Sequence, residues 1–212
     1  MILSKFEVKF YEQLESYFLL HNFDLQLNQK QFRKVTPNGF QNIIFSISET
    51  PKEFWIEVNF GVRNEFIEQI AQQFLNNDHG YRPSANTLVI SIGKFQDLKY
   101  YRFKVTDEEE LNGIMEEVKI FFEKKGFDFL NNNNSLKNID DILNDSPTLP
   151  CRFVYNQIHR CFKGIIAAKL SDNRNFTTIT NIYRHFLLKN GTDDDLLNYE
   201  RLVSFLHHYN AN

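Results

Sequence analysis

Apolar and polar side chains alternate with a period of two along the segment from Phe40 to Val62. Successive side chains of a strand point to opposite faces of a sheet, so the alternation predicts two half-buried strands. A turn over 49–53 that contains Pro51 separates them, which makes the pair a β-hairpin. The core face of the hairpin is predicted to carry Ile43, Phe45, Ile47, Phe54, Ile56, Val58, Phe60 and Val62.

Two segments near the hairpin instead repeat their apolar residues every three or four positions, which is the period of an amphipathic helix. The first runs from Phe6 to His21. The second covers about residues 65–76, follows Asn64 as an N-cap, and has Phe66 in its predicted buried stripe. We therefore expect one helix before the hairpin and one directly after it.

Three further elements are predicted between the second helix and residue 130. Thr87–Ile92 is a compact apolar strand, and residues 100–105 are expected to pair with it after Gly93. A third helix is expected to open at Thr106, which would form a capping box with Glu109. We expect that helix to end at Gly126.

The rest of the chain contains helical patterns only. A short helix follows a Ser135 cap, residues 145–150 form a linker, and three helices are expected over about 151–170, 175–189 and 193–208. Thr192 is a clear N-cap for the last of them.

This segregation of strands and helices predicts an α+β fold with an antiparallel sheet and packed helices, followed by an all-helical C-terminal portion. The expected division has a helix-and-sheet portion over 1–130, a linker with a short helix over 131–150, and a helical portion over 151–212 packed on the first.

The overall composition is that of a folded chain with slightly more acidic than basic residues, 27 against 24. Of 212 residues, 42% are hydrophobic, which suffices for a core, and the net charge is −3. A protein that binds nucleic acid usually has a basic surface, so we expect this protein to bind no nucleic acid. The N-terminus lacks the apolar stretch of a signal peptide, and no run approaches the roughly 18 apolar residues of a membrane span. We expect a soluble cytoplasmic protein, and the abundance of Phe, Asn, Lys and Ile favours a bacterial source.

The two cysteines are expected to be reduced. Cys151 and Cys161 are ten residues apart in one predicted helix, so they would lie about 15 Å apart. A disulfide needs Cα atoms within about 7 Å.

No residue pattern in the chain defines a catalytic or metal site. The acidic runs Glu108–Glu110 and Asp193–Asp195 suit helix starts, where they stabilise the dipole. His207 and His208 would point about 100° apart on a helix. His159 and Cys161 would face away from each other, so with Cys151 they make no zinc site. Glycine-rich phosphate loops are absent. We expect no metal and no cofactor.

Two regions are nonetheless candidates for binding. Loops often carry binding residues, and the loop after the second helix contains His79, Tyr81 and Arg82, although it can also be an ordinary connection. The outward face of the second hairpin strand holds three more polar or aromatic candidates, followed along the strand by a basic one: Trp55, Glu57, Asn59 and Arg63.

Two alternatives stay open for that strand face. An exposed Trp55 beside Arg63 would be an interface anchor. If a helix instead covered Trp55, it would be part of the core, and Glu57 would be a partly buried carboxylate with a raised pKa.

The strand pair IIFSISETPKEFWIEVNFGV follows a helix and a short strand at Phe32–Lys34, and KGFDFLNNNNSLKNIDDIL precedes a helix with GIIAAKLSDNRNF. In this order of elements the chain resembles the bacterial family known as domain of unknown function 4304. The resemblance covers roughly residues 3–190. This chain has His21-Asn22-Phe23 where the family pattern has Gly-Phe. The resemblance implies no established activity and no catalytic residues.

These patterns favour a protein-binding module, of an immunity or toxin-neutralising type, over an enzyme. The alternatives are a small-ligand sensor, or an enzyme with a cleft near Glu57 and His79 to which Arg82 or His159 contributes. The sequence does not define the partner or the oligomeric state.

Overall fold

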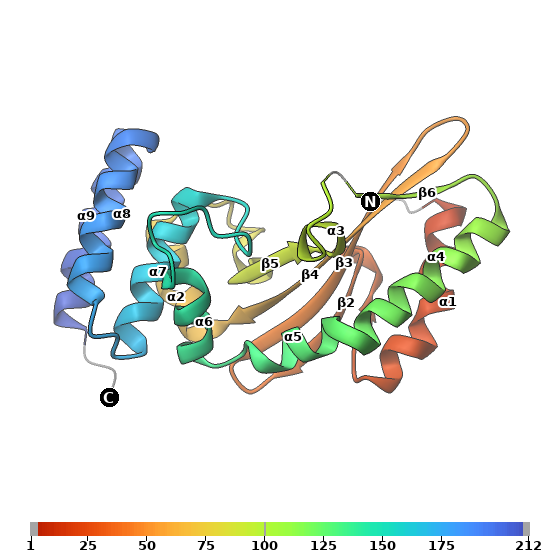
Figure 1. The fold of residues 1–212 in the computed structure, drawn as a ribbon, viewed down its shortest axis with the longest axis horizontal. Coiled ribbons are helices and arrows are strands. Elements are labelled where there is room, and N and C mark those ends of the chain that lie inside the picture. Colours follow the sequence, from red (N-terminus) through yellow and green to blue (C-terminus); the bar gives the residue numbers. More distant parts are fainter. Residues whose placement is uncertain (1–3, 100, 210–212) are drawn as a thin grey trace. The chain divides into compact units, whose positions relative to one another are not determined.

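The predicted hairpin forms the middle of an antiparallel sheet of six strands in the computed structural model, which describes residues 4–99 and 101–209 (Figure 1). The strands follow the order β1-β2-β3-β4-β5. The sixth strand, β6, also pairs with β4. This confirms the predicted α+β class. The strands are β1 (Asp24–Gln26), β2 (Gln31–Thr36), β3 (Gly39–Glu49), β4 (Phe54–Asn64), β5 (Leu88–Ser91) and β6 (Phe103–Val105).

The chain folds into two compact units, each built from two segments. The first comprises Met1–Val62 and Ile90–Asn131, and the second Arg63–Val89 and Asn132–Asn212. One border between the units lies near residue 131. The expected division into portions over 1–130, 131–150 and 151–212 stays a prediction. The helix and loop after β4, which the sequence suggested belong with the sheet, are part of the second unit.

Helices of the first unit pack on one face of the sheet through aromatic side chains. The ring of Phe18 lies 4.6 Å from that of Phe32, and the rings of Phe60 and Phe122 are 5.6 Å apart. These aromatic rings are fully buried, so they form the core of this unit. The helical elements are α1 (Lys5–Leu20), η1 (Leu27–Gln29), α3 (Ile92–Phe95), α4 (Glu108–Phe121), η3 (Phe122–Gly126) and α5 (Phe127–Asn132).

The predicted pairing of residues 100–105 with 87–92 is wrong, and Tyr100 lies outside the described residues. β6 pairs with β4 instead, with Trp55 opposite Lys104. The chain leaves the line of β5 because the hydroxyl of Ser91 accepts a hydrogen bond from the Lys94 N–H at 3.2 Å and starts α3. A helical turn replaces the expected direct return of the strand.

The third predicted helix starts one residue later and ends later than expected. Asp107, not Thr106, is the N-cap, because its carboxylate accepts a hydrogen bond from the N–H of Glu110 at 2.9 Å. Gly126 does not end the helix. It belongs to the π-helical turn η3, in which Phe127 donates its N–H to the carbonyl of Phe122, and α5 continues beyond it.

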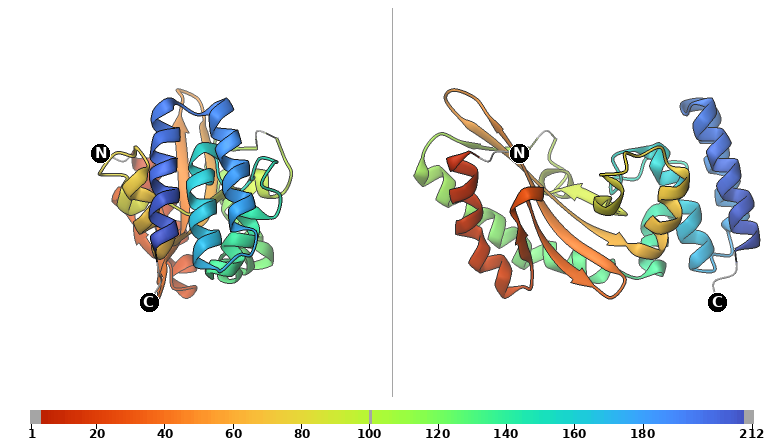
Figure 2. Two further views of the ribbon diagram at one scale, coloured as in Figure 1. Left: turned by 90° about the vertical axis from the view of Figure 1, so that its left-hand side faces the viewer. Right: turned by 180° about the vertical axis from the view of Figure 1, so that it is seen from behind.

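The second unit is helical, with α7 at its centre. α7 contacts α2, α6, α8 and α9, and α8 and α9 run beside it (Figure 2). The predicted caps Asn64, Ser135 and Thr192 are confirmed, since each side chain accepts a backbone N–H at a helix start. The elements are α2 (Glu65–Phe74), η2 (Arg82–Ser84), α6 (Leu136–Asn144), α7 (Gln157–Leu170), α8 (Phe176–Asn190) and α9 (Asp193–His208).

Two details of this unit differ from the prediction. α7 begins after Asn156, whose side-chain oxygen accepts the N–H of Ile158 at 2.9 Å, so Cys151 lies in the preceding loop rather than in the helix. Cys151 and Cys161 nevertheless form no disulfide, and both are buried. On α2, Phe66 is half exposed and Glu68 is buried instead.

Candidate functional site

The outward face of β4 carries Trp55 in a fixed, half-buried position. Its Nε1 donates a hydrogen bond to Glu53 at 2.8 Å. Lys104 of β6 lies opposite in register, with Nζ 2.6 Å from the same carboxylate and 6.0 Å from the indole ring centre. The hydrogen bonds from Lys104 and Trp55 lower the pKa of the Glu53 carboxyl. The indole is therefore neither fully exposed nor part of the core.

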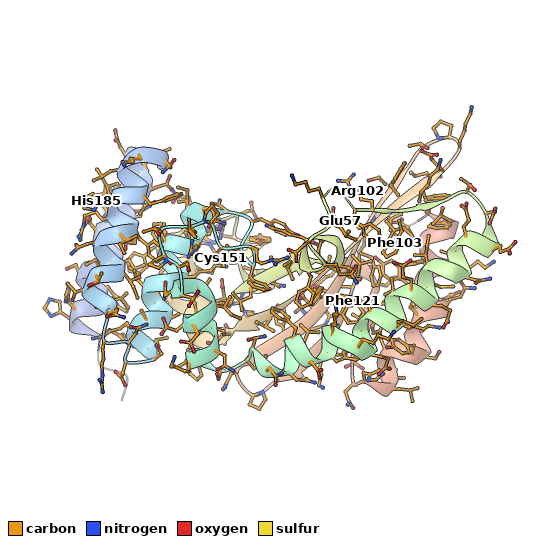
Figure 3. All side chains as sticks on the ribbon, viewed as in Figure 1. Glu57, Arg102, Phe103, Phe121, Cys151 and His185 are labelled. Atoms are coloured by element: carbon orange, nitrogen blue, oxygen red, sulfur yellow. The ribbon has the colours of Figure 1, made fainter. Side chains whose placement is uncertain are left out.

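Glu57 and Asn59 continue this face along β4, and both are half-buried. The carboxylate of Glu57 forms a 3.7 Å ion pair with the more exposed Arg102 (Figure 3). The two ion pairs of this face, Glu53–Lys104 and Glu57–Arg102, balance in charge. These two pairs therefore contribute no net charge to the face.

Arg63, at the end of β4, is buried and serves to hold a loop. Its guanidinium forms two hydrogen bonds with Glu65, at 2.6 and 3.2 Å. Its Nη1 donates to the carbonyls of Arg82 and Ala85, at 2.9 and 2.8 Å. These contacts fix the turn η2, so Arg63 stabilises the loop through its buried guanidinium.

The loop predicted for binding is an ordered series of turns. Tyr81 and Arg82 both donate their N–H groups to the carbonyl of Asp78, at 3.0 and 3.2 Å. Arg82 also donates from Nε to the carbonyl of Asn77 at 3.1 Å. His79 is exposed, and Tyr81 is half exposed with its pKa raised by partial burial. The binding role of the loop stays a prediction.

The residues of the enzyme hypothesis are divided between the two units. Glu57 belongs to the first, and His79, Arg82 and His159 belong to the second. No hydrogen bond or ion pair joins the side chains of His79, Arg82 and His159 to one another in the described part of the second unit. Residues 4–99 and 101–209 also contain no group of three His, Cys, Asp or Glu side chains that could hold a metal ion.

A buried ion pair in the second unit was missed from the sequence. The carboxylate of Glu68 on α2 lies 2.9 Å from Nζ of Lys163 on α7. It also accepts hydrogen bonds from Gln72 at 2.7 Å and Thr87 at 3.0 Å, while Lys163 donates to the carbonyl of Asn86 at 2.6 Å. The sequence signal was a single lysine within the apolar run CFKGIIAA.

Two other titratable groups of α7, His159 and Cys161, are uncharged at pH 7. Burial, with a contribution from Lys163, lowers the pKa of His159, so its imidazole is neutral at pH 7. Burial raises the pKa of the Cys161 thiol to about 12. A thiolate is the reactive form of cysteine, so Cys161 is not a nucleophile.

Arg160 on α7 fixes the segment that follows α6. Its guanidinium donates to the carbonyls of Leu143, at 3.0 and 2.7 Å, Ser146, at 3.0 Å, and Leu149. The hydroxyl of Tyr183 on α8 donates to Leu143 as well, at 2.9 Å. Because a buried arginine satisfies carbonyls on both sides of residues 147–148, this short stretch has a defined position.

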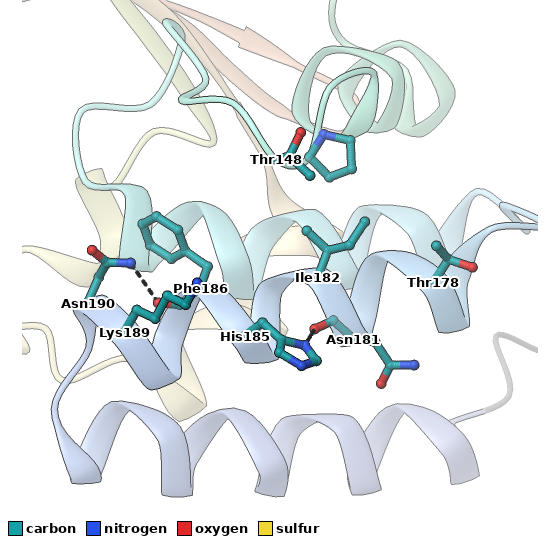
Figure 4. A pocket seen from close by; sticks show the side chains of 9 residues that line it. Thr148, Thr178, Asn181, Ile182, His185, Phe186, Lys189 and Asn190 are labelled. Carbon is teal, nitrogen blue, oxygen red and sulfur yellow. Dashed lines mark hydrogen bonds between the residues drawn. The ribbon is translucent and has the colours of Figure 1, made fainter.

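A groove of about 500 Å³ lies between that stretch and α8 (Figure 4). Its volume is in the usual range of ligand sites. Nδ1 of His185 donates to the carbonyl of Asn181 at 2.7 Å, which leaves Nε2 for a ligand. The residues that line the groove include one lysine and no carboxylate: Pro147, Thr148, Thr178, Asn181, Ile182, His185, Phe186, Lys189 and Asn190.

The sequence predicts the helix α8 that forms one side of this groove, but no pattern in it indicates the groove itself. The wall depends on contacts from Arg160, which lies on a different helix. The nearest signal is the linker around Pro147 and Pro150, whose composition indicates a fixed turn.

Comparisons with known proteins give no relative whose function could help to interpret this geometry. No protein-family model, no curated protein and no solved structure matches the chain. The resemblance to domain of unknown function 4304 stays a prediction. None of the helices within residues 4–99 and 101–209 is long and apolar enough to cross a membrane.

Proposed function

We propose that this protein is a binding module whose second unit accepts an acidic amphipathic helix of another protein in the groove along α8. The observation that carries the proposal is the groove itself, which has a fixed wall at Pro147–Thr148 and an open basic rim. We place this function in the cytoplasm, without nucleic acid, as the sequence suggests.

The length of the groove supports a helical occupant. The α8 residues that line it recur at three- and four-residue steps from Thr178 to Asn190, so they form one stripe along the helix. At 1.5 Å per residue the stripe is about 18 Å long, which equals about three turns of a partner helix. Helix-in-groove recognition uses contacts with this same periodicity.

The chemistry of the lining supports an apolar and acidic partner face. Ile182, Phe186 and Pro147 offer apolar contacts, while Lys189 is exposed and makes no hydrogen bond or ion pair with any described residue. A carboxylate on the partner would meet Lys189 without competition from an acidic residue of the groove. Complementary charge of this kind selects partners and speeds association.

Preorganisation supports specific recognition. Arg160 holds the carbonyls of Ser146 and Leu149, which flank the wall residues Pro147 and Thr148. A wall that is fixed before binding loses little conformational entropy when the partner arrives. The groove is therefore suited to bind without refolding.

Fluorescence anisotropy with two labelled helical peptides tests the proposal. Each peptide has about fourteen residues, long enough to span the stripe, with leucines on one face and either glutamates or lysines beside them. We expect the glutamate peptide to bind the intact chain and the lysine peptide to bind roughly ten-fold more weakly. Lys189→Glu should reverse this preference, whereas Lys137→Glu on α6, which does not line the groove, should leave it unchanged.

A second variant separates the groove from general surface charge. Ile182→Asp places a carboxylate among the apolar contacts and should abolish binding of the glutamate peptide, while Arg160→Gln should weaken it through the wall alone. Equal binding of both peptides, or no effect of Lys189→Glu and Ile182→Asp, would overturn the proposal. Binding of a small molecule within the α8 groove that the peptide cannot displace would do the same.

A further inference from the structure

A second cavity lies in the first unit, and none of the residues that line it lines the α8 groove. It has a volume of about 230 Å³ and is formed by α3, β6, α4 and η3. Its floor is apolar: Ile92, Phe103 and Phe121 are each at most 6% exposed (the two phenylalanines are labelled in Figure 3). Ile120, Lys124 and Lys125 form its rim.

The π-helical turn η3 borders this cavity. Phe127 donates its N–H to the carbonyl of Phe122, five residues earlier, so the turn contains one residue more than an α-helical turn. Such turns are rare inside α-helices and occur frequently at functional sites. Here the turn contains both lysines of the rim, and Phe121 of the floor immediately precedes it.

The two lysines are available to a ligand. Neither Lys124 nor Lys125 forms a hydrogen bond or ion pair with any described residue, and both are exposed. The one carboxylate of the lining, Glu117, already accepts a hydrogen bond from the Tyr101 hydroxyl at 2.6 Å. Two ammonium groups against one carboxylate leave a net charge of +1 at an apolar cavity.

We propose that this cavity binds a small organic carboxylate, with its apolar body against Phe103 and Phe121 and its carboxylate between Lys124 and Lys125. The volume equals about eight times the roughly 30 Å³ that a water molecule occupies in the liquid, so the ligand is small, with roughly eight to ten heavy atoms. Aliphatic and aromatic monocarboxylates both fit this description. The site is independent of the α8 groove, because all its residues belong to the first unit.

Three probes with the same six-carbon chain test the inference: hexanoate, hexan-1-ol and hexylammonium. They differ only in the charge of the head group, and binding is followed through the isoleucine methyl signals of the intact chain by NMR. We expect hexanoate to shift the signals of Ile92 and Ile120 saturably. Hexan-1-ol should bind about ten-fold more weakly, since its hydroxyl cannot form the charge-assisted hydrogen bonds that a carboxylate forms with the two lysines. Hexylammonium should not bind at the cavity.

The variant Lys124→Gln/Lys125→Gln should lose about ten-fold in affinity for hexanoate and retain its affinity for hexan-1-ol. Both side chains are exposed, so the variant is expected to fold. Lys119→Gln is the matched control, because it removes a lysine of α4 that does not line the cavity. The proposal fails if hexan-1-ol binds as tightly as hexanoate, if the double variant binds hexanoate like the unchanged chain, or if millimolar hexanoate gives no saturable shift of Ile92 and Ile120.

Discussion

The ammonium group of Lys163 on α7 lies 2.9 Å from the carboxylate of Glu68 on α2, and both side chains are almost entirely removed from solvent. An isolated charge in such a place would be very unfavourable. Hydrogen bonds of Glu68 with Gln72 and Thr87, and of Lys163 with the carbonyl of Asn86, further compensate for the loss of water. The pair therefore links α2 to the central helix of the second unit. Neither charge can be removed alone without leaving the other buried and unpaired.

Removal of one partner should be strongly destabilising. In Lys163→Met the carboxylate of Glu68 stays buried without its counter-charge, and we expect the free energy of unfolding to fall by about 3–5 kcal/mol. Urea unfolding followed by circular dichroism measures the change. The double variant Glu68→Met/Lys163→Met should regain much of the loss, because it leaves no unpaired charge.

The control for this prediction is the exposed pair Lys137–Asp141 on α6. Lys137→Met should give no measurable change, since exposed ion pairs contribute little. A loss in Lys137→Met as large as in Lys163→Met would show that burial is not the cause.

The Glu68–Lys163 pair also shows why much of the local structure, but not the site, could be predicted from the sequence. The cap at Asn64 and the period of α2 depend on neighbouring residues, and both predictions are confirmed. The identity of the buried face was only partly right, because Phe66 and Glu68 are exchanged relative to expectation. A glutamate can be buried there only because a lysine 95 positions later reaches it, and no local pattern contains that information.

Gly126 should be intolerant of a side chain. An added Cβ would lie 2.4 Å from Cδ1 of the buried Phe122, so Gly126→Ala must displace that ring or the π-helical turn. We expect a loss of about 1–3 kcal/mol in the free energy of unfolding, as for other overpacked cores.

Gly113, on the same helical segment, is the matched control for this substitution. An added Cβ there meets nothing within 4 Å, and alanine favours a helix over glycine by about 1 kcal/mol. Gly113→Ala should therefore stabilise the protein in the same urea experiment. If both variants change stability in the same direction, the close approach of Phe122 to Gly126 is not what distinguishes them.

His159 should give the protein a pH-dependent component of stability. Burial is the main cause of its lowered pKa, and Lys163 adds to it, while Glu68 and Asp195 oppose the shift. The unfolded chain, with the ordinary value of 6.5, therefore takes up the proton first as the pH falls. Stability is fully present above that value and decreases as the pH falls below it.

His159→Gln should remove this component. We expect urea unfolding between about pH 7 and about pH 5 to show a smaller decrease in stability for the variant than for the unchanged chain. His79→Gln, which alters an exposed loop histidine, should retain the full decrease. An unchanged pH dependence in His159→Gln would contradict the assignment.

The candidate sites illustrate a second limit of sequence reasoning. The alternation of β4 correctly predicted that Trp55 and Glu57 share a face, because side-chain direction on a strand is a local property. The groove and the cavity instead arise where distant segments meet: Pro147 beside Ile182, and Phe103 beside Phe121. Their existence depends on tertiary packing, which the order of elements alone does not fix.

Arg63 should be needed for the order of the loop that carries Tyr81 and Arg82. Lysine keeps the charge but lacks the second arm of the guanidinium, so Arg63→Lys cannot pair with Glu65 and also reach the carbonyls of Arg82 and Ala85. Leaving a buried carbonyl unpaired costs about 1–3 kcal/mol. Hydrogen exchange measures the effect at the amides of Ser84 and Ala85, whose hydrogen bonds close the turn η2.

We expect exchange at these two amides to become faster in Arg63→Lys, while the amides of α9 keep their protection. Tyr81→Ala is the control, because that side chain is 52% exposed and Tyr81 takes part in the hydrogen bonds of the loop through its backbone. Exchange at Ser84 and Ala85 that is as slow in Arg63→Lys as in the unchanged chain would mean that the loop is held by its own turns.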